Sequence, residues 1–256
     1  MNKYLLILAF SAIIFTGCST DKETPDSKRE KIIYQQNLLE IFDGEHHFVD
    51  YKYGEFSLIE LFDENNDSAI LFLHGRGLHP NEQKLAYPIR TELSNRYNTY
   101  SIQLPVLKKL STYYDYTKIF YDSDERIKSA IEYISTKNTN IIVVAHSCGV
   151  HMLMSLINNE KLSENISSLV LIGSGAVDKG QKLIYKYPYS KILVPILDIY
   201  GEYDFNYVIS KADERKRIIK TINNKSKQIQ IKSSNHYHED NSSELIAHVK
   251  KWLTNQ

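Results

Sequence analysis

Short apolar runs alternate with longer stretches of helical spacing along most of this sequence. Runs of apolar, largely β-branched residues predict strands at 56–62, 69–75, 99–105, 140–146, 167–173, 192–201 and 227–233. The stretches between them predict helices over about 82–96, 123–136, 149–160, 207–222 and 242–253. Strands that alternate with helices indicate an α/β fold, with a doubly wound, mostly parallel sheet flanked by helices. We expect a single domain over 47–256, with 56–62 at an edge of the sheet.

Residues 140–146, with the sequence NIIVVAH, show no alternation of apolar and polar positions. Such a run is typical of a strand that is buried on both faces of a parallel sheet. The helix predicted at 123–136 shows the opposite pattern, because Ile127, Ile131 and Ile134 share one face. Ser123 is a candidate N-cap for this helix, followed by acidic residues in the first turn.

The N-terminus has the pattern of an export signal. A twelve-residue apolar run, residues 4–15, follows a short basic start and is too short for a bilayer span of about 20 residues. The run ends in Phe15-Thr16-Gly17-Cys18, which resembles the bacterial lipobox, so residues 1–17 are expected to be a lipoprotein signal peptide. Cys18 would then carry the acyl chains that anchor the protein in a membrane. An ordinary signal followed by a chance cysteine is the alternative.

Ser19 after the cysteine resembles an outer-membrane sorting signal, because an Asp there would favour the inner membrane. We therefore expect a lipid-anchored protein of the bacterial cell envelope, facing the periplasm if the cell has two membranes. Residues 19–31, STDKETPDSKREK, are polar and charged and lack aromatic side chains. The segment 18–46 is thus predicted to be a flexible tether and a lead-in to the domain.

Composition excludes some classes of partner. Lys plus Arg and Asp plus Glu number 31 each, so nothing indicates binding to nucleic acid. The chain has two cysteines, and acylation of Cys18 would leave Cys148 without a partner for an intrachain disulfide. No C-x-x-C, H-E-x-x-H or phosphate-loop motif is present, so no metal and no organic cofactor is expected.

The five residues Ala145-His146-Ser147-Cys148-Gly149 stand between the buried strand and a predicted helix. A serine on a sharp strand-to-helix turn is the nucleophile elbow, usually written G-x-S-x-G. Small residues are needed at both flanking positions, and Ala145 and Gly149 meet that need. The alternative is that Ser147 only caps the helix.

Three further motifs extend this pattern into a resemblance to the α/β-hydrolase superfamily over roughly 47–256. The chain is most similar to small bacterial members related to dienelactone hydrolases and to exported relatives. The first motif is His74-Gly75 at the end of an early strand. The resemblance implies an oxyanion hole made by the backbone N–H groups of Arg76 and Cys148.

The other two motifs supply an acid and a base in the order Ser, acid, His. Gly201-Glu202-Tyr203-Asp204 has the G-x-x-D form that places the family's acid at Asp204, with Asp198 and Asp178 as competitors. In the segment SSNHYHED, His236 stands three residues past the predicted end of the last strand and is the expected base. His238 is the alternative.

A segment rich in tyrosine, 106–122, lies between the strand at 99–105 and the next helix. Tyr113, Tyr114 and Tyr116 are the candidate substrate-binding residues, because aromatic rings with polar tips suit the wall of a ligand pocket. The alternative is that these rings only pack the loop onto the domain. No long helical insertion indicates a lipase lid, so small or soluble substrates are favoured.

The sequence therefore predicts a serine hydrolase, most simply an esterase that hydrolyses a small-molecule carboxylic ester through a Ser147-Asp204-His236 triad and an acyl-enzyme. An amidase or peptidase of the same fold is one alternative. A non-catalytic binding lipoprotein on the same scaffold is the other.

Overall fold

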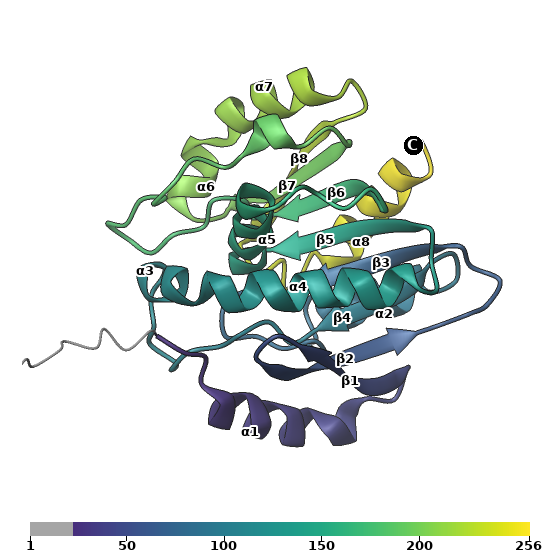
Figure 1. Ribbon diagram of the computed structural model, residues 1–256. Coiled ribbons are helices and arrows are strands. Elements are labelled where there is room, and N and C mark those ends of the chain that lie inside the picture. The colour runs from purple at the N-terminus through teal and green to yellow at the C-terminus, as the bar shows by residue number, and fades with distance from the viewer. Residues whose placement is uncertain (1–22) are drawn as a thin grey trace, which may run out of the picture.

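The computed structural model describes residues 23–256, so the predicted signal peptide and Cys18 lie outside the described residues. Eight strands form one twisted sheet in the order β1-β2-β4-β3-β5-β6-β7-β8 (Figure 1). The pairs β1–β2 and β2–β4 are antiparallel, and every pair from β4 to β8 across the sheet is parallel. The predicted doubly wound, mostly parallel sheet is therefore confirmed.

The strands are β1 (Glu45–Tyr51), β2 (Gly54–Leu61), β3 (Ser68–Leu73), β4 (Asn98–Ile102), β5 (Asn140–His146), β6 (Ile166–Ile172), β7 (Ile196–Tyr203) and β8 (Lys227–Asn235). The α-helices are α1 (Ser27–Asn37), α2 (Ala86–Leu93), α3 (Tyr113–Tyr116), α4 (Phe120–Ser135), α5 (Cys148–Asn159), α6 (Asn206–Ser210), α7 (Ala212–Ile222) and α8 (Ser242–Leu253). Short 3₁₀ turns occur at 38–40, 117–119 and 189–191.

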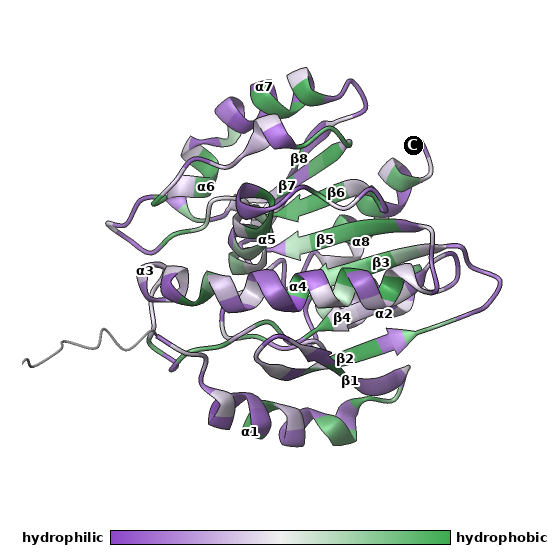
Figure 2. Ribbon diagram, in the orientation of Figure 1, coloured by the Kyte–Doolittle hydropathy of each residue, from purple (hydrophilic) through white to green (hydrophobic). Residues whose placement is uncertain are grey.

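The sheet separates two apolar cores. Helices α4 and α5 pack on the face that is nearer in Figure 1, and α2 and α8 pack on the other face. Along β5, Val143 belongs to the first core and its neighbours Ile142 and Val144 to the second. Successive side chains of a strand point to opposite faces, which explains why this run is apolar without alternation. The strands β3, β5 and β6 are accordingly largely hydrophobic (Figure 2).

The N-terminal part of the chain differs from the prediction. Residues 27–37, which fall in the predicted tether, form helix α1, and β1 rather than the strand at 56–62 is the edge of the sheet. Helix α1 has no buried residue, is largely hydrophilic (Figure 2) and lacks the apolar stripe that identifies a helix in a sequence. In β1 only Val49 is buried, so its pattern is also weak.

Other differences are local. Helix α4 begins at Phe120, so Ser123 is buried inside its first turn and donates to the carbonyl oxygen of Phe120 instead of capping the helix. The helix predicted at 207–222 consists of α6 and α7, which meet at Lys211. Within residues 23–256, no helix is both long enough and apolar enough to cross a membrane.

Candidate active site

The turn between β5 and α5 holds Ser147 in an uncommon backbone conformation. Its φ is 53° and its ψ is −115°, a combination that costs about 1–3 kcal/mol for a residue with a side chain. The Ser147 amide donates to the carbonyl oxygen of Ile172 on β6 over 2.9 Å. The side chain makes no capping hydrogen bond to α5. The hydroxyl is instead presented at the carboxyl end of the sheet, where open parallel sheets bind ligands.

Gly149 lets α5 approach β3 closely. A Cβ at this position would lie 2.4 Å from the carbonyl oxygen of Leu73 and 2.7 Å from that of His74. Both are backbone atoms that cannot give way, so the position requires glycine. Ala145, at the other flanking position, is fully buried in the first core.

Ser147, His236 and Asp204 form one hydrogen-bonded chain. The Ser147 hydroxyl lies 2.8 Å from Nε2 of His236, and Nδ1 of His236 lies 2.6 Å from Oδ1 of Asp204. Since the carboxylate can only accept, Nδ1 carries the proton and Nε2 is free to accept the serine proton. His236 is the residue that directly follows β8, and Asp204 is the residue that directly follows β7.

Asp204 is buried, and its negative charge is stabilised by hydrogen bonds from neighbouring groups of the protein. Burial acts to raise its pKa, but the hydrogen bond and charge of His236 and the amides of Phe205 and Gly201 outweigh burial, so the pKa is lowered. The carboxylate therefore stays ionised beside the imidazole, which fixes the tautomer of His236.

The alternative acids and the alternative base have other partners. Asp198 lies within β7 and accepts from Arg215 (3.0 Å) and from Gln228 (2.7 Å). Asp178 binds the guanidinium of Arg76. His238 is fully buried, and its Nδ1 lies 2.7 Å from the hydroxyl of Ser234. None of these three groups is hydrogen-bonded to Ser147 in the structure.

The residues expected to form the oxyanion hole lie beside Ser147. Cys148 is the first residue of α5, and the first amides of a helix have no intrahelical acceptor. Burial raises the pKa of the Cys148 thiol to about 12, so the side chain is an uncharged, inert neighbour. Arg76 follows β3, and its guanidinium forms two hydrogen bonds to Asp178, at 2.5 and 2.8 Å. This guanidinium is therefore already paired and is not free to attract a substrate carboxylate.

A narrow cavity opens above Ser147. Its volume is about 430 Å³ with the open mouth included, and it is lined by Gly75, Arg76, Leu78, Tyr113, His146, Ser147, Cys148, His151, Ala176, Val177, Phe205 and Tyr237. Of the three candidate tyrosines, Tyr113 lines this cavity. Tyr116 is buried and accepts from the amide of Leu107, whereas Tyr114 is 42% exposed and accepts from the amide of Lys182. The structure thus brings one of the three rings to the cavity, and the other two tie loops together.

Comparison with solved structures gives consistent matches over most of the chain. The esterase Pf2001 of Pyrococcus furiosus covers 86% of this chain and 93% of its own, with 14% identity and a TM-score of 0.67. The carboxylesterase CesB of Bacillus subtilis covers 90% and 99%, with 13% identity and a TM-score of 0.63. The esterase Est1E of Butyrivibrio proteoclasticus covers 83% and 98%, with 14% identity and a TM-score of 0.62. The protein has the α/β-hydrolase fold.

No family model and no curated protein sequence matches the chain. Identities of 13–14% establish the α/β-hydrolase fold and leave the chemistry to be argued from the residues of this chain.

Three residues around His236 were not identified from the sequence. The ring of Phe205 stacks on His236, with centroids 4.2 Å apart and an interplanar angle of 17°. His146 donates through Nε2 to the carbonyl oxygen of His236 over 3.0 Å. Burial lowers the pKa of His146 to about 3, so this histidine is neutral. Gly173, with φ +64°, leaves room for the ring, because a Cβ there would lie 2.7 Å from its Cε1.

Among these residues, only Gly173 had a signal in the sequence, since it directly follows the strand β6 at the carboxyl end of the sheet. The contacts of Phe205 and His146 join segments that are far apart along the chain. Such contacts leave no local pattern.

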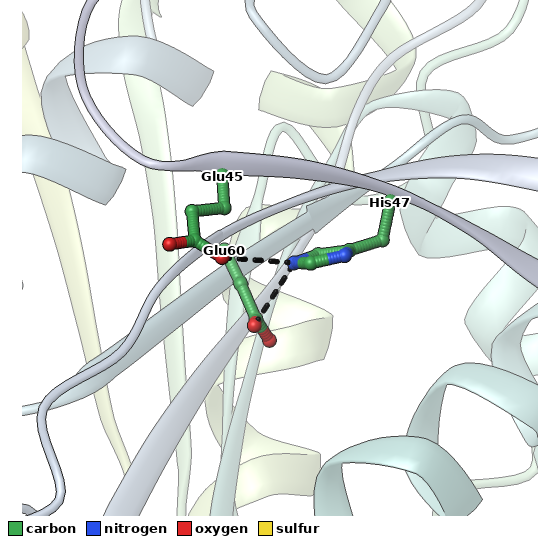
Figure 3. A group of neighbouring side chains, drawn as sticks. All are labelled: Glu45, His47 and Glu60. Atoms are coloured by element: carbon green, nitrogen blue, oxygen red, sulfur yellow. Dashed lines mark ion pairs between the residues drawn. The ribbon is translucent and has the colours of Figure 1, made fainter.

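A possible metal-binding group among the described residues lies elsewhere. Glu45 and His47 on β1 and Glu60 on β2 bring their ligand atoms within 4.8 Å of one another (Figure 3). Lys137 already lies 3.0 Å from both carboxylate oxygens of Glu60. The group is thus partly charge-compensated by the protein itself, and three strands (β2, β4 and β3) separate β1 from β5, which leads into Ser147.

Proposed function

We propose that this protein is a serine hydrolase that cleaves carboxylic esters with a short acyl group. The observation that carries the proposal is the hydrogen-bonded chain from Ser147 through His236 to Asp204 on a strained strand-to-helix turn. A hydroxyl in that position, with an imidazole base oriented by a buried carboxylate, has the geometry of an activated nucleophile.

In the first step His236 takes the proton of Ser147 through Nε2 while Oγ bonds to the acyl carbon. Asp204 stabilises the imidazolium that forms, and the negative charge on the former carbonyl oxygen is bound by the amides of Arg76 and Cys148. The tetrahedral species collapses as His236 returns its proton to the leaving alcohol, which leaves an acyl-enzyme on Ser147. Water then attacks the acyl carbon with His236 again as base, and the carboxylic acid and the free serine are released.

The shape of the site favours a short acyl group. Beside Ser147 the cavity is narrow, and its lining includes the rings of Tyr113 and His151 and the side chain of Ala176. On the far side of Val177 and Phe205 lies a wider groove, about 1190 Å³ with its open face included, whose lining includes Gln181, Asn206 and Tyr207. We assign the acyl group to the narrow cavity and a larger, polar alcohol to the groove. The names of the similar structures, which are esterases and a carboxylesterase, support an ester over an amide.

A series of p-nitrophenyl esters tests this proposal directly. We expect kcat/KM to be highest for acetate or propionate and to fall by about 10-fold or more for octanoate, because a long chain does not fit the narrow cavity. The matched amide, p-nitroacetanilide, is expected to be a far poorer substrate. A folded protein that hydrolyses no ester of the series would contradict the enzyme assignment and favour a binding role for the same cavity.

We further propose that Cys18 carries lipid and anchors the protein in the bacterial cell envelope, as the lipobox-like segment before it indicates. Radioactive palmitate supplied to expressing bacteria is expected to label the wild-type protein and not Cys18→Ser. Equal labelling of both would refute acylation at Cys18.

A further inference from the structure

The amide of Arg76 belongs to a small turn, residues 75–78, whose peptide planes are fixed by hydrogen bonds from the side chains of His74 and Arg29. In this turn the Leu78 amide donates to the carbonyl oxygen of Gly75 over 3.2 Å. Nδ1 of His74 donates to the same oxygen over 2.8 Å. That oxygen and the Arg76 N–H belong to one peptide plane, and a peptide is planar. Whatever fixes the Gly75 carbonyl therefore also fixes the direction of the proposed oxyanion donor.

The far side of the turn is held by helix α1. Arg29 donates through Nη2 to the carbonyl oxygen of Gly77 over 3.2 Å and through Nη1 to the carbonyl oxygen of Leu107. The Gly77 oxygen and the Leu78 N–H lie in one peptide plane. Arg29 thus orients the amide that holds Gly75, which in turn orients the amide of Arg76. Gly77 has φ +69°, a conformation that favours glycine, and a Cβ there would lie 3.1 Å from the Arg29 guanidinium, which would have to shift by a few tenths of an ångström.

Polar contacts alone position the start of α1. Asp26 caps the helix by accepting from the Arg29 amide (3.0 Å), and its own amide donates to the carbonyl oxygen of Val106 (2.8 Å). Glu30 binds the buried Arg126 (3.0 Å) and accepts from the amide of Val106 (3.1 Å). Helix α1 buries no residue, and its later part contacts β1 through the ring of Tyr34, which lies 4.7 Å from that of His46 and 5.2 Å from that of Phe48. The contacts of the first turn of the helix therefore place the guanidinium of Arg29 against the turn at 75–78.

We propose that Arg29 is a positioning residue for the oxyanion hole, so that a helix outside the sheet completes the catalytic machinery. This inference rests on the proposed function. Small displacements of a catalytic group reduce the rate strongly, because transition-state stabilisation depends on exact placement of the donors. The role of Arg29 therefore concerns the transition state, with little influence on binding of the ground-state ester.

The test compares Arg29→Ala, Arg29→Lys and Lys28→Ala in the full-length protein, with p-nitrophenyl acetate as substrate. Lys28 is an exposed neighbour on the same helix, so its variant removes the same charge and leaves the turn untouched. We expect Arg29→Ala to lower kcat by about 10-fold with KM nearly unchanged and with the pH profile of kcat unaltered. The rate of labelling by a fluorophosphonate is expected to fall in proportion. Arg29→Lys, which can reach one carbonyl oxygen, is expected to lie between Arg29→Ala and the wild type, and Lys28→Ala to match the wild type.

Wild-type kcat in Arg29→Ala would overturn the inference. If Arg29→Ala does not fold, Arg29→Lys decides alone: a folded Lys variant with wild-type kcat would overturn it, and reduced kcat at unchanged KM would support it. An equal loss of kcat in Lys28→Ala would also overturn it, since the effect would then come from charge on α1. Failure of the proposed function gives a different result, because the wild type itself would then be inactive.

Discussion

Replacing Ser147 by alanine is expected to lower kcat for p-nitrophenyl acetate by about 10⁴-fold or more. The reason is that, among the described residues, the Ser147 hydroxyl is the nucleophile hydrogen-bonded to Nε2 of His236, and without it no acyl-enzyme can form. The variant should remain folded, since the serine side chain makes no capping bond and alanine adds no atoms. The measurement is steady-state hydrolysis, together with labelling by a fluorophosphonate probe that bonds only to an activated serine.

Two further variants identify the base. His236→Ala is expected to lose labelling as completely as Ser147→Ala. His238→Gln should keep it, because His238 contacts Ser234 and not the nucleophile. Labelling that survives in His236→Ala and disappears in His238→Gln would move the base to His238. Labelling that survives in Ser147→Ala would remove Ser147 from the mechanism altogether.

Mild acid is expected to unfold this protein, because four buried histidines and the half-buried His79 are held in the neutral form. Burial lowers the pKa of His74 and His146 to about 3 and that of His79, His151 and His238 to about 4. An unfolded histidine has a pKa of about 6.5. Below pH 6.5 these histidines bind protons in the unfolded chain but not in the folded chain. Their contribution to stability is therefore fully present above pH 6.5 and is lost as the pH falls toward 4.

The size of this effect follows from the number of protons. Each additional proton bound by the unfolded state lowers the free energy of unfolding by about 1.4 kcal/mol per pH unit, so five histidines give a slope of up to about 7 kcal/mol per pH unit. Domains of this kind are stable by about 5–15 kcal/mol, so unfolding is expected near pH 5. Asp124 and Glu30 act in the opposite direction, because burial raises the pKa of Asp124 to about 6 and that of Glu30 above its usual value, but they are two groups against five.

Urea titrations between pH 7 and pH 4.5, followed by circular dichroism, measure this slope. His79→Gln is the matched variant, since Nδ1 of His79 is buried without a hydrogen-bond partner. Removing this histidine is expected to reduce the slope by about 1.4 kcal/mol per pH unit, the contribution of one proton. A free energy of unfolding that stays constant down to pH 4.5 would show that the histidines are hydrated in the folded state.

The elements of the sheet core were predictable because their apolar runs are local. The run at 140–146 is β5 itself, and the helix predicted at 242–253 coincides with α8. The residues after strand ends were predictable for the same reason, since parallel strands bring their carboxyl ends to one edge. Ser147, Asp204 and His236 all follow predicted strands, and the resemblance to the α/β-hydrolase superfamily selected them from their competitors as nucleophile, acid and base.

The features that the sequence did not reveal depend on pairs of distant residues. Arg76 and Asp178 are 102 positions apart, and Arg29 lies 48 positions from the glycine that it holds. Helix α1 has no apolar stripe, because charged and backbone groups attach its first turn and the ring of Tyr34 attaches its later part. A polar helix of this kind cannot be distinguished from a tether until its partners are known. Tyr114 and Tyr116 illustrate the same limit, since an aromatic cluster does not indicate which ring faces a cavity.

The position of α1 has a practical consequence for handling the protein. The described chain enters the fold just before Arg29, where the carbonyl oxygen of Glu23 accepts from Tyr121 and the amide of Asp26 donates to Val106. A load applied to the N-terminal end is therefore transmitted through these contacts to the helix that holds the turn at 75–78. The C-terminal end follows α8, which packs on the opposite face of the sheet from α4 and α5 (Figure 1). Immobilisation on a solid support, or fusion to a reporter, therefore belongs at Gln256, where strain in the linker does not reach the catalytic end of the sheet.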